Sequence, residues 1–257
     1  MTLHVSHLGE QGSPVVLLHG LFGQGKNWTT IAKALADNHR VTMVDLPQHG
    51  RSAWSSRFDF REAAEQVAAV WPDDEPVTLV GHSLGGKVSM ILALLHPERV
   101  AKLCVADIAP AAYSTSREFV GYTNALKALD LESLERRQDA DDALLEAVPN
   151  PTVRSFLLQN LRREGDSWRW QVNLDVIERD LDVISGWPDD LLAGVPPYEG
   201  PVLWIAGERS DYVREEYAPE MTRLFPLNRK VTIKNAGHWV HSEQPEVFTE
   251  VLRRFLK

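Results

Sequence analysis

Six short runs of apolar residues recur along the chain, and each run ends in turn-forming residues. They cover 14–20, 40–47, 76–83, 102–110, 201–208 and 230–238. Because apolar residues follow one another in these runs with little polar alternation, the runs predict strands that are covered on both faces. Such strands are typical of a parallel sheet, which requires helices on both sides.

Amphipathic stretches lie between the apolar runs. Apolar positions recur three or four residues apart over 27–37, 59–71, 84–96, 214–225 and 244–256. This spacing predicts helices with one buried face. Strand–helix alternation therefore predicts an α/β fold, with a mostly parallel sheet flanked by helices and right-handed crossovers. Ligands bind such sheets beyond the carboxyl ends of the strands, so functional residues are expected directly after the apolar runs.

One long segment, 111–200, contains no strong buried strand. Its helical patterns cover 115–129, 131–148, 152–163 and 174–187, and the aromatic-rich 167–172 is ambiguous. We therefore predict a helical cap inserted between two sheet strands. No Gly/Ser-rich linker sets it apart, so one domain is expected over 1–257, with the cap insertion at 111–200 inside it. Five aromatic residues of the cap are candidates either for an apolar pocket or for the cap core: Phe119, Tyr122, Phe156, Trp168 and Trp170.

The charge balance narrows the choice of partners. The 257 residues include 36 acidic and 27 basic side chains, for a net charge of −9 without any basic cluster. This argues against nucleic acids and anionic membrane surfaces as partners. The single cysteine, Cys104, excludes an intrachain disulfide and favours a reducing compartment. No signal peptide pattern or bilayer-length apolar run is visible, so the prediction is a cytoplasmic protein without a membrane partner.

The stretch "GHSLGG" at 81–86 is the clearest candidate for chemistry. It joins an expected strand to an expected helix and contains the pattern G-x-S-x-G. At such a turn Gly81 and Gly85 allow close packing, and Ser83 presents its hydroxyl at the start of the helix. The alternative is an ordinary tight turn. The strand–turn–helix context favours a nucleophilic serine, with helix N–H groups pointing towards a developing negative charge.

A serine hydroxyl needs a base, and the sequence offers two histidines near the end of the last expected strand. His238 lies in "NAGHW" directly after that strand, and His241 follows three residues later. We favour His238, because His241 is expected as an exposed residue entering the final helix. The remaining seven histidines carry no comparable signal.

An oxyanion needs hydrogen-bond donors, and two loops supply candidates. One donor is the backbone N–H of Leu84, the residue after the nucleophile, and the other is Leu21 N–H in "HGLFGQG" at 19–25. Phe22 and His82, which adjoin Leu21 and Ser83, are predicted to contact substrate. The alternative for 19–25 is a plain glycine-rich turn.

These motifs together resemble a known superfamily. "LLHGLFGQGKNW", "DLPQHGRS", "GHSLGG" and "NAGHW" occur in this order and resemble the α/β-hydrolase superfamily over nearly the whole chain. "GHSLGGKVSM", "VADIAPAAY" and "FLLQNLRREGDSWRW" are similar to the YbfF-type esterases, small bacterial hydrolases of acyl esters and thioesters. The resemblance implies the α/β-hydrolase fold and a serine esterase. Epoxide hydrolases and haloalkane dehalogenases carry Asp at the nucleophile position, so Ser83 argues against both.

The third member of a triad, a carboxylate that orients the base, has two candidates. In most of the superfamily the acid follows the strand at 201–206 in the pattern G-x-x-D. Here that position is Ser210, and Asp211 comes next. The resemblance to the YbfF-type esterases implies that the acid comes from a "DIAP"-like motif, which contains Asp107 here. A carboxylate at a buried strand end is costly unless paired. The resemblance favours Asp107, and Asp211 remains the alternative.

The expected reaction is hydrolysis of a small acyl ester or thioester by a Ser-His-Asp triad, without a cofactor or metal. No clustered set of His, Cys and Asp suggests a metal site. Three alternatives stay open. They are acyl transfer to an alcohol, a lyase or C–C hydrolase like those of the menaquinone pathway, and a hydrolase-fold sensor that binds a small ligand.

Overall fold

A seven-stranded sheet forms the centre of the computed structural model, which describes residues 2–72, 75–114 and 117–257. The strand order is β1-β3-β2-β4-β5-β8-β9. The bounds are β1 (Val5–Leu8), β2 (Ser13–Leu18), β3 (His39–Val44), β4 (Val77–His82), β5 (Val100–Ala106), β8 (Val202–Gly207) and β9 (Asn228–Ile233). All six strands expected from the apolar runs are present and pair in parallel. The mostly parallel α/β architecture is therefore confirmed.

The first strand, β1, has no counterpart among the expected strands. It pairs antiparallel with β3 at the edge of the sheet and is at most half-buried. A four-residue edge strand that buries little apolar surface leaves no strong apolar run in the sequence.

The register of the parallel strands brings their carboxyl ends to one edge of the sheet. Leu18 of β2 pairs with Gly81 of β4, and His82 pairs with Ala106 of β5. Ala106 in turn pairs with Ile205 of β8. Residues that directly follow these four strands therefore lie close together although they are far apart in the sequence.

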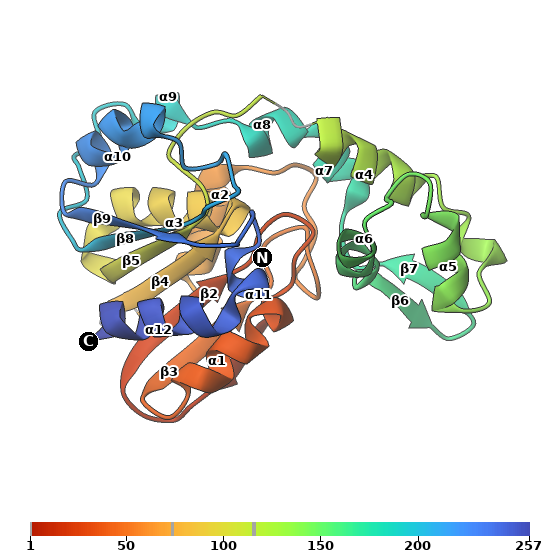
Figure 1. Cartoon of the computed structure of the whole chain (residues 1–257), viewed down its shortest axis with the longest axis horizontal. Coiled ribbons are helices and arrows are strands. Elements are labelled where there is room, and N and C mark those ends of the chain that lie inside the picture. The colour runs from red at the N-terminus through yellow and green to blue at the C-terminus, as the bar shows by residue number, and fades with distance from the viewer. Residues whose placement is uncertain (1, 73–74, 115–116) are drawn as a thin grey trace.

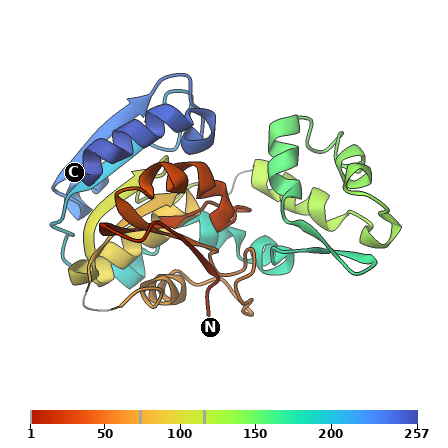
Figure 2. The same cartoon turned by 90° about the horizontal axis from the view of Figure 1, so that it is seen from below.

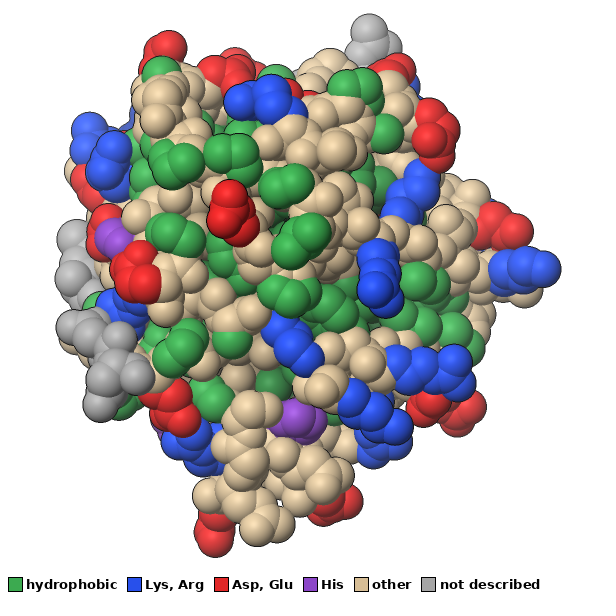
Figure 3. All heavy atoms as spheres, turned by 90° about the vertical axis from the view of Figure 1, so that its left-hand side faces the viewer, with side chains coloured by type: hydrophobic (Ala, Val, Ile, Leu, Met, Phe, Trp, Pro, Cys, Tyr) green, Lys and Arg blue, Asp and Glu red, His purple; other side chains and the backbone are tan. Residues whose placement is uncertain are grey.

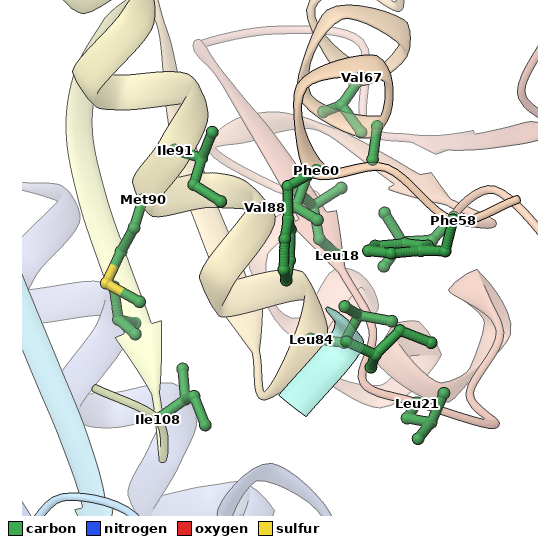
Figure 4. Packing of buried hydrophobic residues seen from close by; sticks show 14 of the residues in the cluster. Leu18, Leu21, Phe58, Phe60, Val67, Leu84, Val88, Met90, Ile91 and Ile108 are labelled. Carbon is green, nitrogen blue, oxygen red and sulfur yellow. The ribbon is translucent and has the colours of Figure 1, made fainter. Parts of the chain in front are cut away.

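Helices cover both faces of the sheet (Figure 1). Their bounds are α1 (Thr29–Leu35), α2 (Phe60–Ala68), α3 (Leu84–Leu95), α10 (Ala218–Leu224), α11 (Val240–Glu243) and α12 (Pro245–Leu256), with short 3₁₀ turns at Gly25–Trp28, Pro97–Arg99 and Glu215–Tyr217. Val15 and Leu17 of β2 pack in one apolar cluster with residues of α1 and α12. Val16 and Leu18 pack in a second cluster with α2 and α3, part of which Figure 4 shows.

The helix α3 is buried on all sides rather than on one. Its residues from Leu84 to Leu94 are buried between β4, β5 and α2. The amphipathic spacing expected over 84–96 is therefore only part of its pattern, because a helix that is covered all round is apolar all round. This burial fixes the position of the residue that precedes the helix.

The chain between β5 and β8 forms a second group of elements. These are α4 (Arg117–Lys127), α5 (Arg137–Ala143), α6 (Pro151–Leu158), α7 (Leu174–Arg179), α8 (Leu181–Ser185) and α9 (Asp189–Leu192), a 3₁₀ turn at Leu131–Ser133, and the antiparallel hairpin β6 (Leu161–Glu164) and β7 (Ser167–Trp170). Figures 1 and 2 show α4–α7 and the hairpin gathered at one end of the molecule, beside the sheet.

The segment is mostly helical as expected, with corrections. The helix expected over 131–148 is a 3₁₀ turn at Leu131–Ser133 followed by α5, and the helix expected over 174–187 is divided into α7 and α8. Residues 161–163, expected at the end of a helix, belong to β6, and the ambiguous 167–172 supplies β7. Gly165 makes the turn between them with φ +62°, a conformation that favours glycine. The first two residues of the helix expected over 115–129 lie outside the described residues. The division into one domain with a cap at 111–200 stays a prediction.

Side chains of the cap bind the loops at the strand ends. Asn160 Nδ2 donates to the Phe22 carbonyl at 2.7 Å, and Gln24 Nε2 donates to Asn160 Oδ1 at 2.8 Å. On the other side, the Asp180 carboxylate accepts from Phe58 N–H at 2.7 Å. These bonds connect the segment between β5 and β8 to the loops that follow β2 and β3.

The surface carries mixed charge. On the face shown in Figure 3, acidic and basic side chains both stand between apolar ones. Within the described ranges, every helix is too short or too polar to cross a lipid bilayer. The cytoplasmic location stays a prediction.

Candidate active site

Ser83 occupies a strained turn between β4 and α3. Its φ of 52° and ψ of −116° are unusual for a residue with a side chain. The two flanking glycines make the turn possible. A Cβ at Gly81 would lie 2.3 Å from the Gly85 carbonyl oxygen, and one at Gly85 would lie 2.5 Å from that of Leu18. Only glycine allows the helix to start this close to the strands, which places the Ser83 hydroxyl at the sheet edge.

His238 follows β9 in a loop, and its side chain is 12% exposed. Its Nδ1 lies 2.8 Å from Oδ2 of Asp107. Its ring stacks on the ring of Tyr212, with centroids 4.1 Å apart. These two contacts fix the orientation of the imidazole. Burial raises the pKa of Tyr212 to about 12, so this phenol stays neutral beside His238.

Asp107 lies directly after β5 and is fully buried. Its Oδ1 accepts from Gly207 N–H at 2.9 Å. Its Oδ2 accepts from the Ser210 hydroxyl and faces His238 Nδ1. Three donors thus surround one buried carboxylate, which offsets the cost of removing it from water.

Asp211, the alternative acid, is exposed and makes no hydrogen bond to His238 within the described ranges. Of the two candidates, the structure places Asp107 against His238. Ser210 was singled out in the sequence only as the residue at the usual carboxylate position. Its contact with Asp107 joins residues 103 positions apart, and no local pattern signals it.

The N–H groups of Leu21 and Leu84 are free in the described part of the chain, whereas their neighbours are bonded. Phe22 N–H donates to His49 Nε2 at 3.2 Å. Ser83 N–H donates to Ala106 O and Gly85 N–H to His19 O, both at 3.1 Å. Leu21 and Leu84 also line one cavity together with Ser83. Figure 4 shows the side chains of Leu21 and Leu84 near each other. Two unpaired donors beside a hydroxyl are the arrangement that an oxyanion requires.

The cavity beside Ser83 has a volume of about 40 Å³. Apolar side chains from both parts of the molecule line it, among them Ile108, Phe119 and Ile184. Of the five aromatic residues considered for a pocket, Phe119 is the one that lines this cavity. Trp168, by contrast, donates its Nε1–H to Leu134 O inside the cap.

Lys87 also lines this cavity, and the sequence analysis did not single it out. It lies one turn after Ser83 on α3 and is 2% exposed. Burial lowers the pKa of its ammonium group to about 7. In the sequence, the only local feature of Lys87 is its position in the first turns of an apolar helix. That position does not predict which groups Lys87 contacts.

Phe22 and His82, the two expected substrate contacts, are both buried. Phe22 is 1% exposed and lies outside the cavity lining, with its ring against Phe119 at a centroid distance of 6.3 Å. His82 is buried beneath the site, where its Nε2 donates to the His238 carbonyl at 2.8 Å. Phe22 lies in the loop after β2, and His82 is the last residue of β4. Both side chains pack beneath the loops of the site. The expected contact of Phe22 and His82 with substrate stays a prediction.

His241, the alternative base, is buried rather than exposed. Its ring stacks on Trp28 at 4.3 Å and contacts His82 at 4.6 Å, and its Nδ1 has no partner in the described structure. Burial, reinforced by the nearby His238, lowers the pKa of His241 to about 3. Burial also lowers the pKa of His82 well below its usual range. His241 is therefore a neutral packing residue. The rings of His82 and His238 lie between it and Asp107.

Metal ligation was also considered. Across residues 2–72, 75–114 and 117–257, no group of three or more His, Cys, Asp or Glu side chains is arranged to hold a metal ion.

Comparison with known proteins shows the family of this chain. Residues 13–245 match the protein family described as alpha/beta hydrolase fold. The sn-1-specific diacylglycerol lipase ABHD11 of Mus musculus is 36% identical, over 94% of this chain and 80% of that protein. Esterase YbfF of Escherichia coli (strain K12) is 33% identical, over 95% of this chain and 93% of that protein. The solved structure of a marine microorganism esterase, 35% identical, superposes with a TM-score of 0.94 and covers 99% of each chain.

Proposed function

The chain belongs to the α/β-hydrolase fold family, and on this premise we propose that it hydrolyses small carboxylic esters through an acyl-enzyme formed on Ser83. The relatives compared above, which match at least 94% of this chain, are named as esterases and a lipase, so the reaction type is carboxylic ester hydrolysis. The contact between Asp107 and His238 at 2.8 Å, at the same sheet edge as Ser83, carries the proposal. The other contacts assign the roles.

His238 is the proposed base. Asp107 accepts the hydrogen bond from Nδ1–H, which leaves the lone pair of Nε2 available to take the proton of the Ser83 hydroxyl. The Ser83 oxygen then attacks the ester carbonyl. The N–H groups of Leu21 and Leu84 stabilise the negative charge on the carbonyl oxygen of the tetrahedral intermediate.

Three proton transfers complete the cycle. His238 gives its proton to the leaving alcohol, and the C–O bond of the ester breaks to form the acyl-enzyme. Water then replaces the alcohol, loses its proton to His238 and attacks the acyl carbonyl. The acid is released when His238 returns the proton to Ser83. A thioester would follow the same steps with a thiol as leaving group.

The size of the cavity supports a short acyl group. One water-sized sphere needs about 10–15 Å³ of such volume, so a cavity of about 40 Å³ takes a few methylene-sized groups. The mouse relative is named as a lipase of diacylglycerol. The volume beside Ser83 holds few methylene groups, so we favour short acyl groups for this chain.

The test is a turnover panel on p-nitrophenyl acetate, butyrate and octanoate, an acyl thioester and diacylglycerol, with and without added ethanol. We expect multiple turnover on acetate and butyrate. Ser83→Ala should lower kcat by up to about a million-fold if the triad acts as a unit. Equal turnover by wild type and Ser83→Ala would contradict the role of Ser83. Ester formation with ethanol would assign transfer to an alcohol, and failure to turn over would favour the sensor or the lyase.

A further inference from the structure

Lys87 makes three contacts with one end of a cap helix. Its Nζ lies 2.6 Å from the carbonyl oxygen of Ser185, 2.5 Å from that of Gly186 and 3.4 Å from that of Ile184. These carbonyls belong to the C-terminal end of α8, where a positive charge is favoured by the helix dipole. Within the described ranges, no Asp or Glu pairs with Lys87. The carbonyls therefore satisfy the buried ammonium group.

The contacts of Lys87 join two walls of the cavity. Lys87 extends from α3, the helix that begins directly after Ser83, and α8 contributes Ile184 and Ser185 to the same cavity. The position of α8 therefore decides how far the cavity extends from the Ser83 hydroxyl. Lys87 fixes that position with respect to α3.

The end of α8 is also connected to the loop that contacts His238. Ser185 O, which accepts from Lys87, also accepts from Tyr113 N–H at 3.0 Å. The Tyr113 hydroxyl donates to Tyr212 O at 2.6 Å, and the Tyr212 ring stacks on His238. Lys87 Nζ itself lies 5.0 Å from the centroid of the Tyr113 ring. A movement of α8 would therefore alter both the shape of the cavity and the contacts that link α8 through Tyr113 to Tyr212.

We propose that Lys87 is a positioning residue that limits the length of the acyl chain, because it holds the end of α8 against α3 beside Ser83. The three N–H donors of its ammonium group are used by the three carbonyls, so none is left for substrate. The inference rests on the proposed function, since it takes Ser83 as the nucleophile. It adds the structural cause of the chain-length limit.

Lys87→Met tests the contact. Methionine has a similar length but no donor, so the carbonyls at the end of α8 lose their partners and α8 is released towards water. We measure kcat/KM for p-nitrophenyl octanoate and acetate at the same pH for every variant. The octanoate-to-acetate ratio should rise by about tenfold, the scale of one or two methylene groups in an apolar pocket.

Lys102→Met is the matched control. Lys102 Nζ donates to the carbonyls of Phe255 and Leu256 at 2.9 and 3.0 Å, at the end of α12 and far from the cavity. This variant loses the same kind of contact, so it should lower the melting temperature without changing the octanoate-to-acetate ratio. A ratio that rises equally in both variants would mean general loosening and would overturn the proposal.

Ile184→Ala tests the wall without touching Lys87. It shortens the cavity-lining side chain of α8 and should also raise the octanoate-to-acetate ratio. An unchanged ratio in Ile184→Ala, or in folded Lys87→Met, overturns the inference. If these ratios stay constant while Ser83→Ala abolishes turnover, the inference alone fails. If Ser83→Ala turns over like wild type, the proposed function fails instead.

Discussion

At the scale of single residues, the environment of Asp107 is the strongest constraint on the site. A fully buried carboxylate is tolerated when donors surround it, and here Gly207 N–H and the Ser210 hydroxyl supply two. His238 supplies the third at 2.8 Å. Asp107 also has a positive φ of 52°, which an aspartate adopts at a cost. The fold thus accepts both strain and desolvation at one residue to place a carboxylate behind the histidine.

Substitution of each aspartate by asparagine tests whether Asp107 or Asp211 is the acid of the triad. Asp107→Asn keeps the shape but no longer favours the Nδ1–H tautomer of His238, and the corresponding change in serine proteases lowers kcat by about ten-thousand-fold. We expect a loss of that order here, measured as kcat on p-nitrophenyl acetate. Asp211→Asn, at the exposed position, is the control and should stay near wild type. A larger loss in Asp211→Asn would transfer the role of the acid to that residue.

At the scale of elements, the cap and the loop that follows β2 depend on each other. Asn160, between α6 and β6, is fully buried and donates to the carbonyls of Phe22 and Leu157. It also accepts from Gln24. Phe22 and Gln24 lie one and three residues after Leu21, so the position of this oxyanion donor depends on a side chain from the cap.

Asn160→Ala should therefore affect catalysis from a distance. Each buried partner left unsatisfied costs about 1–3 kcal/mol, so the melting temperature should fall. Displacement of Leu21 N–H should in addition lower kcat, while KM changes less, because the donor acts mainly on the transition state. Asn228→Ala removes an Asn side-chain bond to Phe225 O remote from the site and serves as the control. Equal kcat values in the two variants would contradict the dependence.

The elements also show what the sequence reveals and what it does not. The six parallel strands coincide with the apolar runs of the sequence, although β9 at the sheet edge is only partly buried. Ser83 and His238 lie in local motifs at the ends of these strands, so both were visible in the sequence. β1 and the hairpin β6–β7 bury too little to leave a pattern. The choice between Asp107 and Asp211, the bond from Ser210 and the contacts of Lys87 depend on segments about a hundred residues apart. Periodicity carries no information about such pairs.

At the scale of the whole molecule, several buried histidines link folding to pH. Burial lowers the pKa of His49 and of His241 to about 3, and it lowers the pKa of His82 and His19 as well. An unfolded chain binds protons at these residues near pH 6.5, whereas the folded protein does not until the pH is far lower. The stability from these neutral histidines is therefore present above about pH 6.5. It is lost as the pH falls from there towards 3.

His241→Phe tests this link at one residue. Phenylalanine can keep the stacking on Trp28 and removes both the titration and the unpartnered Nδ1. Each such histidine steepens the fall of the unfolding free energy by up to about 1.4 kcal/mol per pH unit. The advantage of His241→Phe over wild type should therefore grow as the pH falls from 6.5 to 4.5, measured by urea unfolding at each pH. His7→Gln, at an exposed position, should leave the acid dependence of the wild type unchanged. A constant difference between His241→Phe and wild type across this range would show that His241 is protonated in the folded state, against the burial and ring contacts that surround it.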